Sequence, residues 1–178
     1  MAVFVPETGD GLENANSYLS LEDFKDISDL FDYDYSDFTD SQIEARLIRS
    51  TMILDSEYRM DFPGKRETDE QALEWPRHGA VYVDGADIDT GVVPKEVQYA
   101  TVEMFYSLAT GTAQPVLSSN GAVAMERDRV EGAVERERRY RSDYNYRRDI
   151  YTTVTDALSR ITGGLSSYSK LKIIRVGG

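Results

Sequence analysis

The stretch TDSQIEARLIRSTMILDSEYR, residues 39–59, decides the fold. Thr39 and Gln42 have the spacing of a capping box, in which two side chains satisfy the first backbone groups of a helix. Apolar residues then recur at helical spacing, and the charged residues Glu44, Arg46 and Arg49, with Asp55, lie mostly off that stripe. The stripe consists of Ile43, Leu47, Ile48, Met52, Leu54 and Tyr58. The stretch therefore predicts a core helix over residues 40–59.

Further helices are predicted on both sides of this one. Ser20 is a suitable cap for a short helix from Leu21 to about Leu30. Pro94 is typical of a first helical position and Gly111 of a helix end, which predicts a helix between them. Its inward face would be Val97, Ala100, Thr101, Met104, Phe105 and Leu108. A last helix is predicted from Arg148 to Ile161, with the stripe Ile150, Val154, Ala157, Leu158 and Ile161 before Gly163 and Gly164.

The segments between these helices are irregular. Residues 61–92 contain no long periodic pattern: 62–64 read as a turn, 70–73 as one helical turn, and 80–83 as a short extended piece. Residues 125–138 alternate acids and bases. They fit a charged β-hairpin with strands 123–130 and 133–138, and they also fit a solvated helix broken at Gly132.

The fold class predicted from these elements is mostly α. It is a small helical bundle with a charged β-hairpin insertion and extended N- and C-terminal arms. Residues 1–19 would be the N-terminal arm, 20–162 the helical domain with its insertion at about 121–147, and 163–178 a C-terminal tail. A length of 178 residues suits one such domain.

The composition excludes some kinds of site and argues against some kinds of partner. There is no cysteine, which excludes disulfides and thiolate metal sites. No apolar run approaches the length of a membrane span, and the N-terminus lacks the basic region of a signal peptide, so no membrane partner is expected. The net charge of −12 argues against simple binding to nucleic acid. Charge is uneven: residues 1–40 hold eleven acids and one base, whereas 165–178 hold three bases and no acid.

Motifs for catalysis are sparse, and no enzyme activity or cofactor is predicted. His78 is the only histidine, so a histidine-dependent catalytic triad would have to use it. A structural or exposed role is expected for His78. Asp89-Thr90-Gly91 spells the aspartic-protease tripeptide. Such a site needs two aspartates sharing a proton, and this single copy follows a polar turn, so catalysis there is disfavoured.

The acidic loop around residue 33 is the one candidate for calcium, which prefers clustered oxygen ligands. Its carboxylates are Asp29, Asp32, Asp34 and Asp37. Counted from Asp32, the glycine and glutamate of an EF-hand loop are missing. The favoured interpretation is a solvated loop whose Phe31 and Phe38 pack down, with no metal.

A run of arginine and tyrosine lies beyond the charged alternation. Such residues can stack on bases and bind phosphates, and they are also enriched at protein interfaces. Glu135, Glu137 and Asp143 interrupt the run, which favours a subunit interface. The predicted interface residues are Arg136, Arg138, Arg139, Tyr140, Arg141, Tyr144 and Tyr146.

Four strings together resemble a known phage family. They are residues 9–18 (GDGLENANSY), 45–58, 71–77 (QALEWPR), and Val93-Pro94 leading to Val97 and Ala100. The chain is similar over residues 3–111 to tailed-phage head–tail connector adaptors, many of which carry the label "DnaT-like single-stranded-DNA-binding protein". Physical roles are expected for the matching residues. Gly9 and Gly11 permit a tight turn, and Asn14 and Asn16 can bond to local backbone. Tyr18 is expected to cover the edge of the core, and Trp75 with Pro76 to pack the irregular segment against the two central helices.

The resemblance also implies partners and place. It implies a homo-oligomeric ring of about twelve subunits beneath the portal protein. Such a ring joins a downstream neck or tail protein and lets double-stranded DNA pass without specific binding. The location would be the neck of a virion assembled in the host cytoplasm. The alternative function is a single-stranded-DNA-binding or replication-accessory protein that uses the arginine and tyrosine run.

The C-terminal tail is the expected portal-docking segment. Its apolar residues stand among basic ones, a pattern that can add as a strand or fill a groove on a partner. The predicted portal-binding residues are Lys170, Leu171, Lys172, Ile173, Ile174, Arg175 and Val176. The alternative is that the tail folds back on its own domain.

Overall fold

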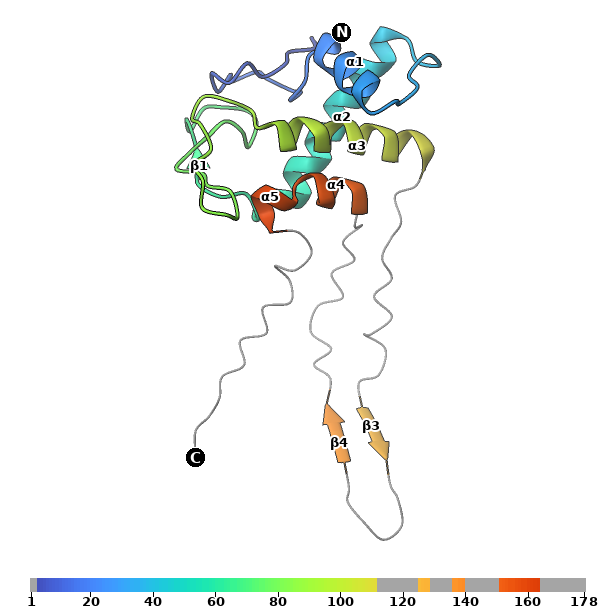
Figure 1. The fold of residues 1–178 in the computed structure, drawn as a ribbon, viewed down its shortest axis with the longest axis vertical. Coiled ribbons are helices and arrows are strands. Elements are labelled where there is room, and N and C mark those ends of the chain that lie inside the picture. The colour runs from blue at the N-terminus through green and yellow to red at the C-terminus, as the bar shows by residue number, and fades with distance from the viewer. Residues whose placement is uncertain (1–2, 112–124, 129–135, 140–150, 164–178) are drawn as a thin grey trace. The chain divides into compact units, whose positions relative to one another are not determined.

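The computed structural model describes residues 3–111, 125–128, 136–139 and 151–163. The chain divides into two compact units, one of Met1–Thr112 with Tyr151–Gly178 and one of Ala113–Ile150. We call the first the body and the second the hairpin unit, and each is described by itself. The described elements are mostly helical, as the sequence predicts, and Figure 1 shows the helices of the body packed together.

The central helix is α2, Asp40–Tyr58, and its capping box between Thr39 and Gln42 is present as predicted. Ile43, Leu47 and Leu54 are fully buried. The assignment of Met52 to the stripe is wrong, because this side chain is 66% exposed. Nine residues after Ile43, a helix has turned to the opposite face, and the polar Ser50 and Thr51 occupy the buried positions instead.

Two helices pack with α2. α1, Leu21–Leu30, begins with a capping box between Ser20 and Asp23. α3, Lys95–Thr110, ends at Gly111 in the left-handed conformation, as predicted. Pro94 is the cap of α3 and not its first residue, a shift of one position. The predicted stripe of α3 is buried from Val97 to Phe105, and Leu108 is half-buried.

The predicted last helix is shorter and broken. It consists of α4, Thr152–Ala157, and α5, Ser159–Thr162, with Leu158 between them and Gly163 closing α5. Val154, Leu158 and Ile161 are buried as predicted; residues 148–150 lie outside the described residues. The hydroxyls of Tyr58 and Thr155 are 2.8 Å apart, which joins α2 to α4.

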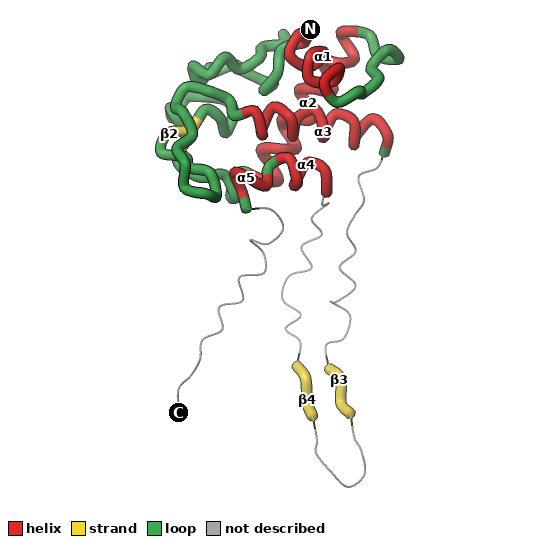
Figure 2. Tube along the Cα trace, in the orientation of Figure 1, coloured by secondary structure: helices red, strands yellow, loops and turns green. Residues whose placement is uncertain are grey.

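The segment between α2 and α3 contains two very short strands, which are too short to show a periodic pattern in the sequence. β1, Lys65–Arg66, pairs antiparallel with β2, Arg77–His78. Residues 70–73 form bends and not the helical turn that the sequence predicts. Figure 2 shows how much of this side of the body is loop.

The hydrophobic core lies between α1, α2 and α3. Phe24 of α1 meets Phe105 of α3 with ring centroids 4.5 Å apart. Phe31 and Phe38 of the acidic loop pack against this cluster, as the sequence predicts. The buried members of the cluster are Leu19, Phe24, Ile27, Ile43, Leu47, Val102 and Phe105. Burial of side chains this large is the main source of stability in a domain of this size.

The hairpin unit contains β3, Met125–Asp128, and β4, Arg136–Arg139, paired antiparallel. The strand interpretation of the charged segment is thus confirmed over these residues, and the helical one is wrong there. The register places Glu126 opposite Arg138, Arg127 opposite Glu137, and Asp128 opposite Arg136. Residues of opposite charge facing across two strands favour pairing, whereas like charges would oppose it.

Candidate functional site: a buried junction beside an acidic pocket

The N-terminal segment, residues 3–19, is extended and lies on the body. The side chain of Asn16 accepts a bond from the Val5 amide at 2.9 Å and donates one to the Val3 carbonyl at 2.8 Å. The Glu7 amide donates to the Ser17 carbonyl at 2.8 Å. Asn16 thus joins two stretches that are distant in sequence, where the sequence predicts bonds to local backbone. Ala15, Ser17, Tyr18 and Leu19 are buried as a result.

A buried carboxylate organises the turn in this segment. Glu7 accepts bonds from the amides of Gly9, Gly11 and Leu12 at 2.9, 2.9 and 3.0 Å. Gly9 has φ of +103°, and a Cβ added there would lie 2.1 Å from the Gly91 carbonyl oxygen. Only glycine permits both the backbone conformation and this approach, so the expected tight turn is present and is pressed against the loop before α3.

The buried polar group at the centre of the body joins three segments, and we call it the junction. The Tyr18 hydroxyl donates to a carboxylate oxygen of Asp55. The same hydroxyl accepts a bond from the Trp75 amide at 3.2 Å, and Asp55 accepts one from the Glu74 amide at 3.1 Å. Tyr18 and Trp75 are fully buried. Tyr18 therefore lies inside the core and not at its edge.

The junction shifts the pKa of both ionisable groups. Burial raises the pKa of Asp55 to about 6, although the bonds from Tyr18 and the Glu74 amide act in the opposite direction. Burial also raises the pKa of Tyr18 well above its ordinary value, with the neighbouring Asp55 charge adding to the effect. Both groups favour the neutral form because a charge loses its hydration in the core.

Arg77 extends the junction toward the small sheet. Its guanidinium donates to the carbonyls of Pro63 and Gly64 at 2.8 and 3.0 Å and to the Glu74 carboxylate at 2.8 Å. Burial leaves 9% of this side chain exposed. Arg77 therefore holds the loops between α2 and α3 together, and its donors face the protein itself.

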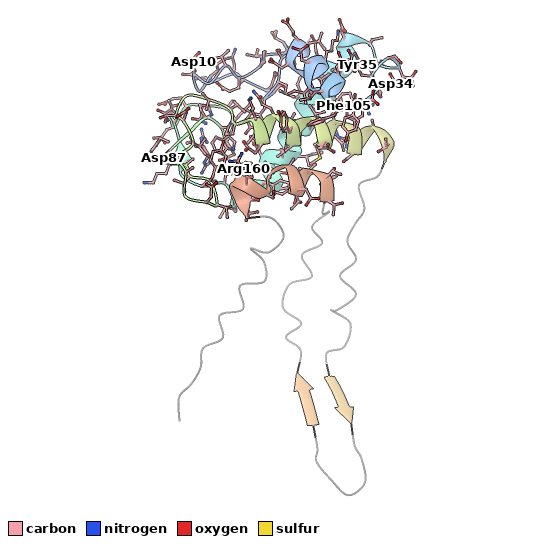
Figure 3. The ribbon with its side chains drawn as sticks, viewed as in Figure 1. Asp10, Asp34, Tyr35, Asp87, Phe105 and Arg160 are labelled. Atoms are coloured by element: carbon pink, nitrogen blue, oxygen red, sulfur yellow. The ribbon has the colours of Figure 1, made fainter. Side chains whose placement is uncertain are left out.

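An open pocket of about 550 Å³ lies beside this frame, before and along the start of α3. The lining residue Tyr82 is held by two side chains outside the lining. Arg160 of α5 donates to Glu96 of α3 at 2.8 Å, and its guanidinium lies 4.5 Å from the centre of the Tyr82 ring. Figure 3 labels Arg160 and the pocket residue Asp87. The lining is Glu7, Thr8, Tyr82, Asp87, Ile88, Asp89, Val92, Val93, Pro94, Lys95 and Gln98.

The sequence motifs for catalysis and metal binding lie at exposed positions. Asp89 is exposed at the pocket, and His78 on β2 is exposed with Glu67 at 3.7 Å. The four carboxylates of the acidic loop are exposed. Within the described part of the chain, no group of three or more histidine and acidic side chains is placed to hold a metal ion, and no helix is long and apolar enough to span a membrane.

Several basic side chains of the body are held by its own groups. Arg46 lies over the rings of Phe38 and Phe105, 4.7 and 5.3 Å from their centres. Lys25 pairs with Asp40 at 2.8 Å. Arg66 donates to the carbonyls of Asp69 and Gln71. Together with Arg77 and Arg160, these residues contribute to the fold and do not gather into a phosphate-binding surface.

The residues that the sequence proposes for partners are placed only in part. Arg136, Arg138 and Arg139 belong to β4. Tyr140, Arg141, Tyr144, Tyr146 and the whole segment Lys170–Val176 lie outside the described residues. The sequence reasoning missed Glu7, Asp55 and Glu96. Asp55 had a detectable signal, since it lies eight residues after the buried Leu47, close to the same helical face.

In a comparison with protein families, residues 1–176 match the family described as "Putative DnaT-like ssDNA binding protein". Comparison with curated proteins and with solved structures found no match.

Proposed function

We propose that this chain, which belongs to the family described as "Putative DnaT-like ssDNA binding protein", works as an oligomeric structural adaptor in the neck of a tailed phage. In this role it forms a ring below the portal, joins head to tail and leaves a channel for DNA. The chain contributes contacts and no catalysis. The portal, further copies of itself and a downstream neck or tail protein are its partners.

The observation that carries the proposal is how the four resembling strings meet. Tyr18 comes from the first string, Asp55 from the second, and Glu74 and Trp75 from the third. The Tyr18 hydroxyl bonds Asp55 and the Trp75 amide, and Asp55 also accepts a bond from the Glu74 amide. The first string also lies against Gly91, two residues before the fourth. The strings meet in the core, where their polar groups hydrogen-bond to one another. Such contacts build a rigid frame, which is what an adaptor subunit requires.

The chemistry of the junction supports a structural role for its ionisable groups. Asp55 has a raised pKa, a property that active-site carboxylates share. Its side chain, however, is bonded to Tyr18 and to the backbone of Glu74, and it does not line the pocket. A general base must reach a substrate proton, so this position suits a core residue.

Charge along the sequence supports assembly from copies of the chain. Residues 1–112 carry 24 acidic and 8 basic side chains, whereas residues 113–178 carry 8 acidic and 12 basic ones. Opposite charge on two parts of one chain favours contacts between copies and sets their register. In this arrangement the arginine and tyrosine run from Arg136 to Tyr146 contributes subunit contacts, and Lys170–Val176 binds the portal.

The acidic body also suits a channel through which DNA passes. A surface of like charge repels the duplex and discourages it from sticking during passage. The proposal therefore includes double-stranded DNA as cargo of the channel and excludes it as a specific ligand.

The printed family description favours a second candidate, a single-stranded-DNA-binding or replication-accessory protein. This candidate takes its phosphate contacts from the arginine and tyrosine run, because Arg46, Arg66 and Arg77 of the body are held internally. Base stacking on the tyrosines of that run would complete such a site.

Fluorescence anisotropy with labelled single-stranded DNA separates the two candidates. For the adaptor we expect a Kd weaker than about 10 µM at about 200 mM salt, with Arg139→Ala and Arg141→Ala leaving it unchanged. Lys65→Ala on β1 is the matched control for loss of one positive charge. Binding tighter than about 1 µM at that salt, abolished by the two arginine changes and not by the control, would establish the second candidate instead.

A further inference from the structure

Part of the lining of the acidic pocket is apolar, formed by Ile88, Val92, Val93 and Pro94. Val92 is 40% exposed, and Val81 and Val83, 40% and 64% exposed, are the sequence neighbours of the lining residue Tyr82. Exposed apolar side chains that gather at a cleft are typical of a surface that a partner covers. The pocket is therefore a candidate docking surface.

The charge of the rim selects the kind of partner. Asp84, Asp87 and Asp89 are exposed in the same loop, and Asp87 and Asp89 line the pocket. The carboxylate of Glu7 is already bonded to three amides, and Glu96 to Arg160, so the exposed charges of the lining are Asp87, Asp89 and Lys95. With Asp84 of the same loop, the exposed acids outnumber this base. A ligand that fits has apolar side chains among positive charges.

The chain itself supplies such a segment next to the pocket. α5 ends at Gly163, and the Val83 amide donates to the Arg160 carbonyl at 2.8 Å. A Cβ on Gly163 would lie 3.9 Å from the Val83 side chain. Gly163, after which the last fifteen residues of the chain follow, thus lies beside the loop that lines the pocket through Tyr82.

We propose that the pocket is the docking site of this chain's own C-terminal segment, residues 164–178, in the unassembled subunit. The segment has Lys170, Lys172 and Arg175, no acid, and the apolar residues Leu171, Ile173, Ile174 and Val176. Fifteen residues reach about 50 Å when extended, far more than the distance across the pocket rim requires. Its direct attachment at Gly163 raises its local concentration at the pocket above that of any separate peptide.

This docking covers the apolar residues of the segment before a partner is present. The apolar side chains of the pocket lining, Val92 among them, and those of the segment would shield one another from water. The inference does not depend on the adaptor role: it concerns the unassembled chain, whatever protein later takes up the segment.

Paired cysteines test the proposal in the full chain, because the sequence contains no cysteine of its own. Val92→Cys at the pocket is combined with Ile174→Cys. The control combines Ile174→Cys with Met60→Cys, an 85% exposed position just beyond α2. Disulfide formation under mild oxidation is followed on non-reducing gels and by thiol counting. We expect the pocket pair to close within one chain about tenfold faster than the control pair.

A charge reversal sharpens the same experiment. Asp87→Lys with Asp89→Lys should slow closure of the pocket pair, and Lys170→Glu with Lys172→Glu in that background should restore it. Equal rates for the pocket and control pairs would overturn the proposal. So would a pocket pair that links only two separate chains, since the pocket would then receive another subunit's segment. A closure rate indifferent to the aspartate changes would overturn the charge recognition.

Discussion

The junction and the hairpin unit use polar residues in opposite ways. In the junction, Tyr18, Asp55 and Arg77 are buried or nearly so and bond to backbone groups of loops far apart in the sequence. In the hairpin, charges alternate along two short strands, so that Glu126 faces Arg138 across the register. The first arrangement fixes one structure for the body, because an unpaired buried polar group is costly. The second sets an acid opposite a base in three of the four residue pairs of a separate unit.

The largest effect should come from the core around which the junction is built. Leu47→Ala in α2 or Met104→Ala in α3 removes a fully buried side chain. Each should lower the free energy of unfolding by roughly 2–5 kcal/mol. Denaturant unfolding measures it, with Met52→Ala as the matched exposed control, expected within about 0.5 kcal/mol of wild type. A loss below about 1 kcal/mol for both core changes would show that the stripes are placed wrongly.

The pH dependence of the junction should be the next largest effect. The pKa of Asp55 in the folded protein, about 6, lies above its ordinary value of 3.8, so folding favours the protonated acid. The stabilisation is complete below about pH 4 and is lost as pH rises through 6, by up to about 3 kcal/mol. Unfolding of wild type and Asp55→Asn from pH 4 to 7 measures it. A stability difference between them that is constant with pH would contradict the buried position of Asp55.

A smaller effect should follow removal of one hydroxyl. Tyr18→Phe keeps the ring but leaves the Trp75 amide without its acceptor and Asp55 without its donor. We expect a loss of about 1–3 kcal/mol of unfolding free energy. Tyr33→Phe is the matched control, since its hydroxyl bonds to Glu103 at a partly exposed position and should cost less. Equal losses for both variants would mean that the junction hydroxyl contributes no more to the free energy of unfolding than a partly exposed one.

The smallest effect on stability should come from the hairpin unit. Arg138→Glu places two acids opposite each other in the register, and Glu126→Arg in the same chain restores opposite charges. We expect less than about 0.5 kcal/mol of change in the body's unfolding for either variant. Assembly, followed by light scattering, should be lost in the single variant. If the double variant assembles no better than the single one, Arg138 does not act in assembly through strand pairing.

The elements with a strong period were predictable from sequence, and the contacts between loops were not. The helix cap at Ser20, the capping box at Thr39 and the helix end at Gly111 were identified because their signals are local. The junction depends on Tyr18 and Trp75, 57 residues apart, meeting through loops that have no period. The strands β1 and β2 were missed for the same reason: two residues each are too short to show alternation.

Of the regions proposed to carry function, the sequence predicted the hairpin and did not predict the pocket. The charged alternation predicted a hairpin, and its strands confirm it, although the sequence alone fitted a helix nearly as well. The pocket could not be foreseen, because it is lined by Glu7, by the loop at Tyr82 and by α3, which the fold alone brings together. Asp89 was visible in the sequence as part of the tripeptide Asp89-Thr90-Gly91, and its position at a pocket was not.

Native mass spectrometry of the purified chain mixed with the portal of the same phage and a single-stranded oligonucleotide tests the central claim most directly. The account predicts a ring of about twelve subunits that is bound to the portal and carries no oligonucleotide. A monomer or dimer that carries the oligonucleotide and leaves the portal unbound would contradict it.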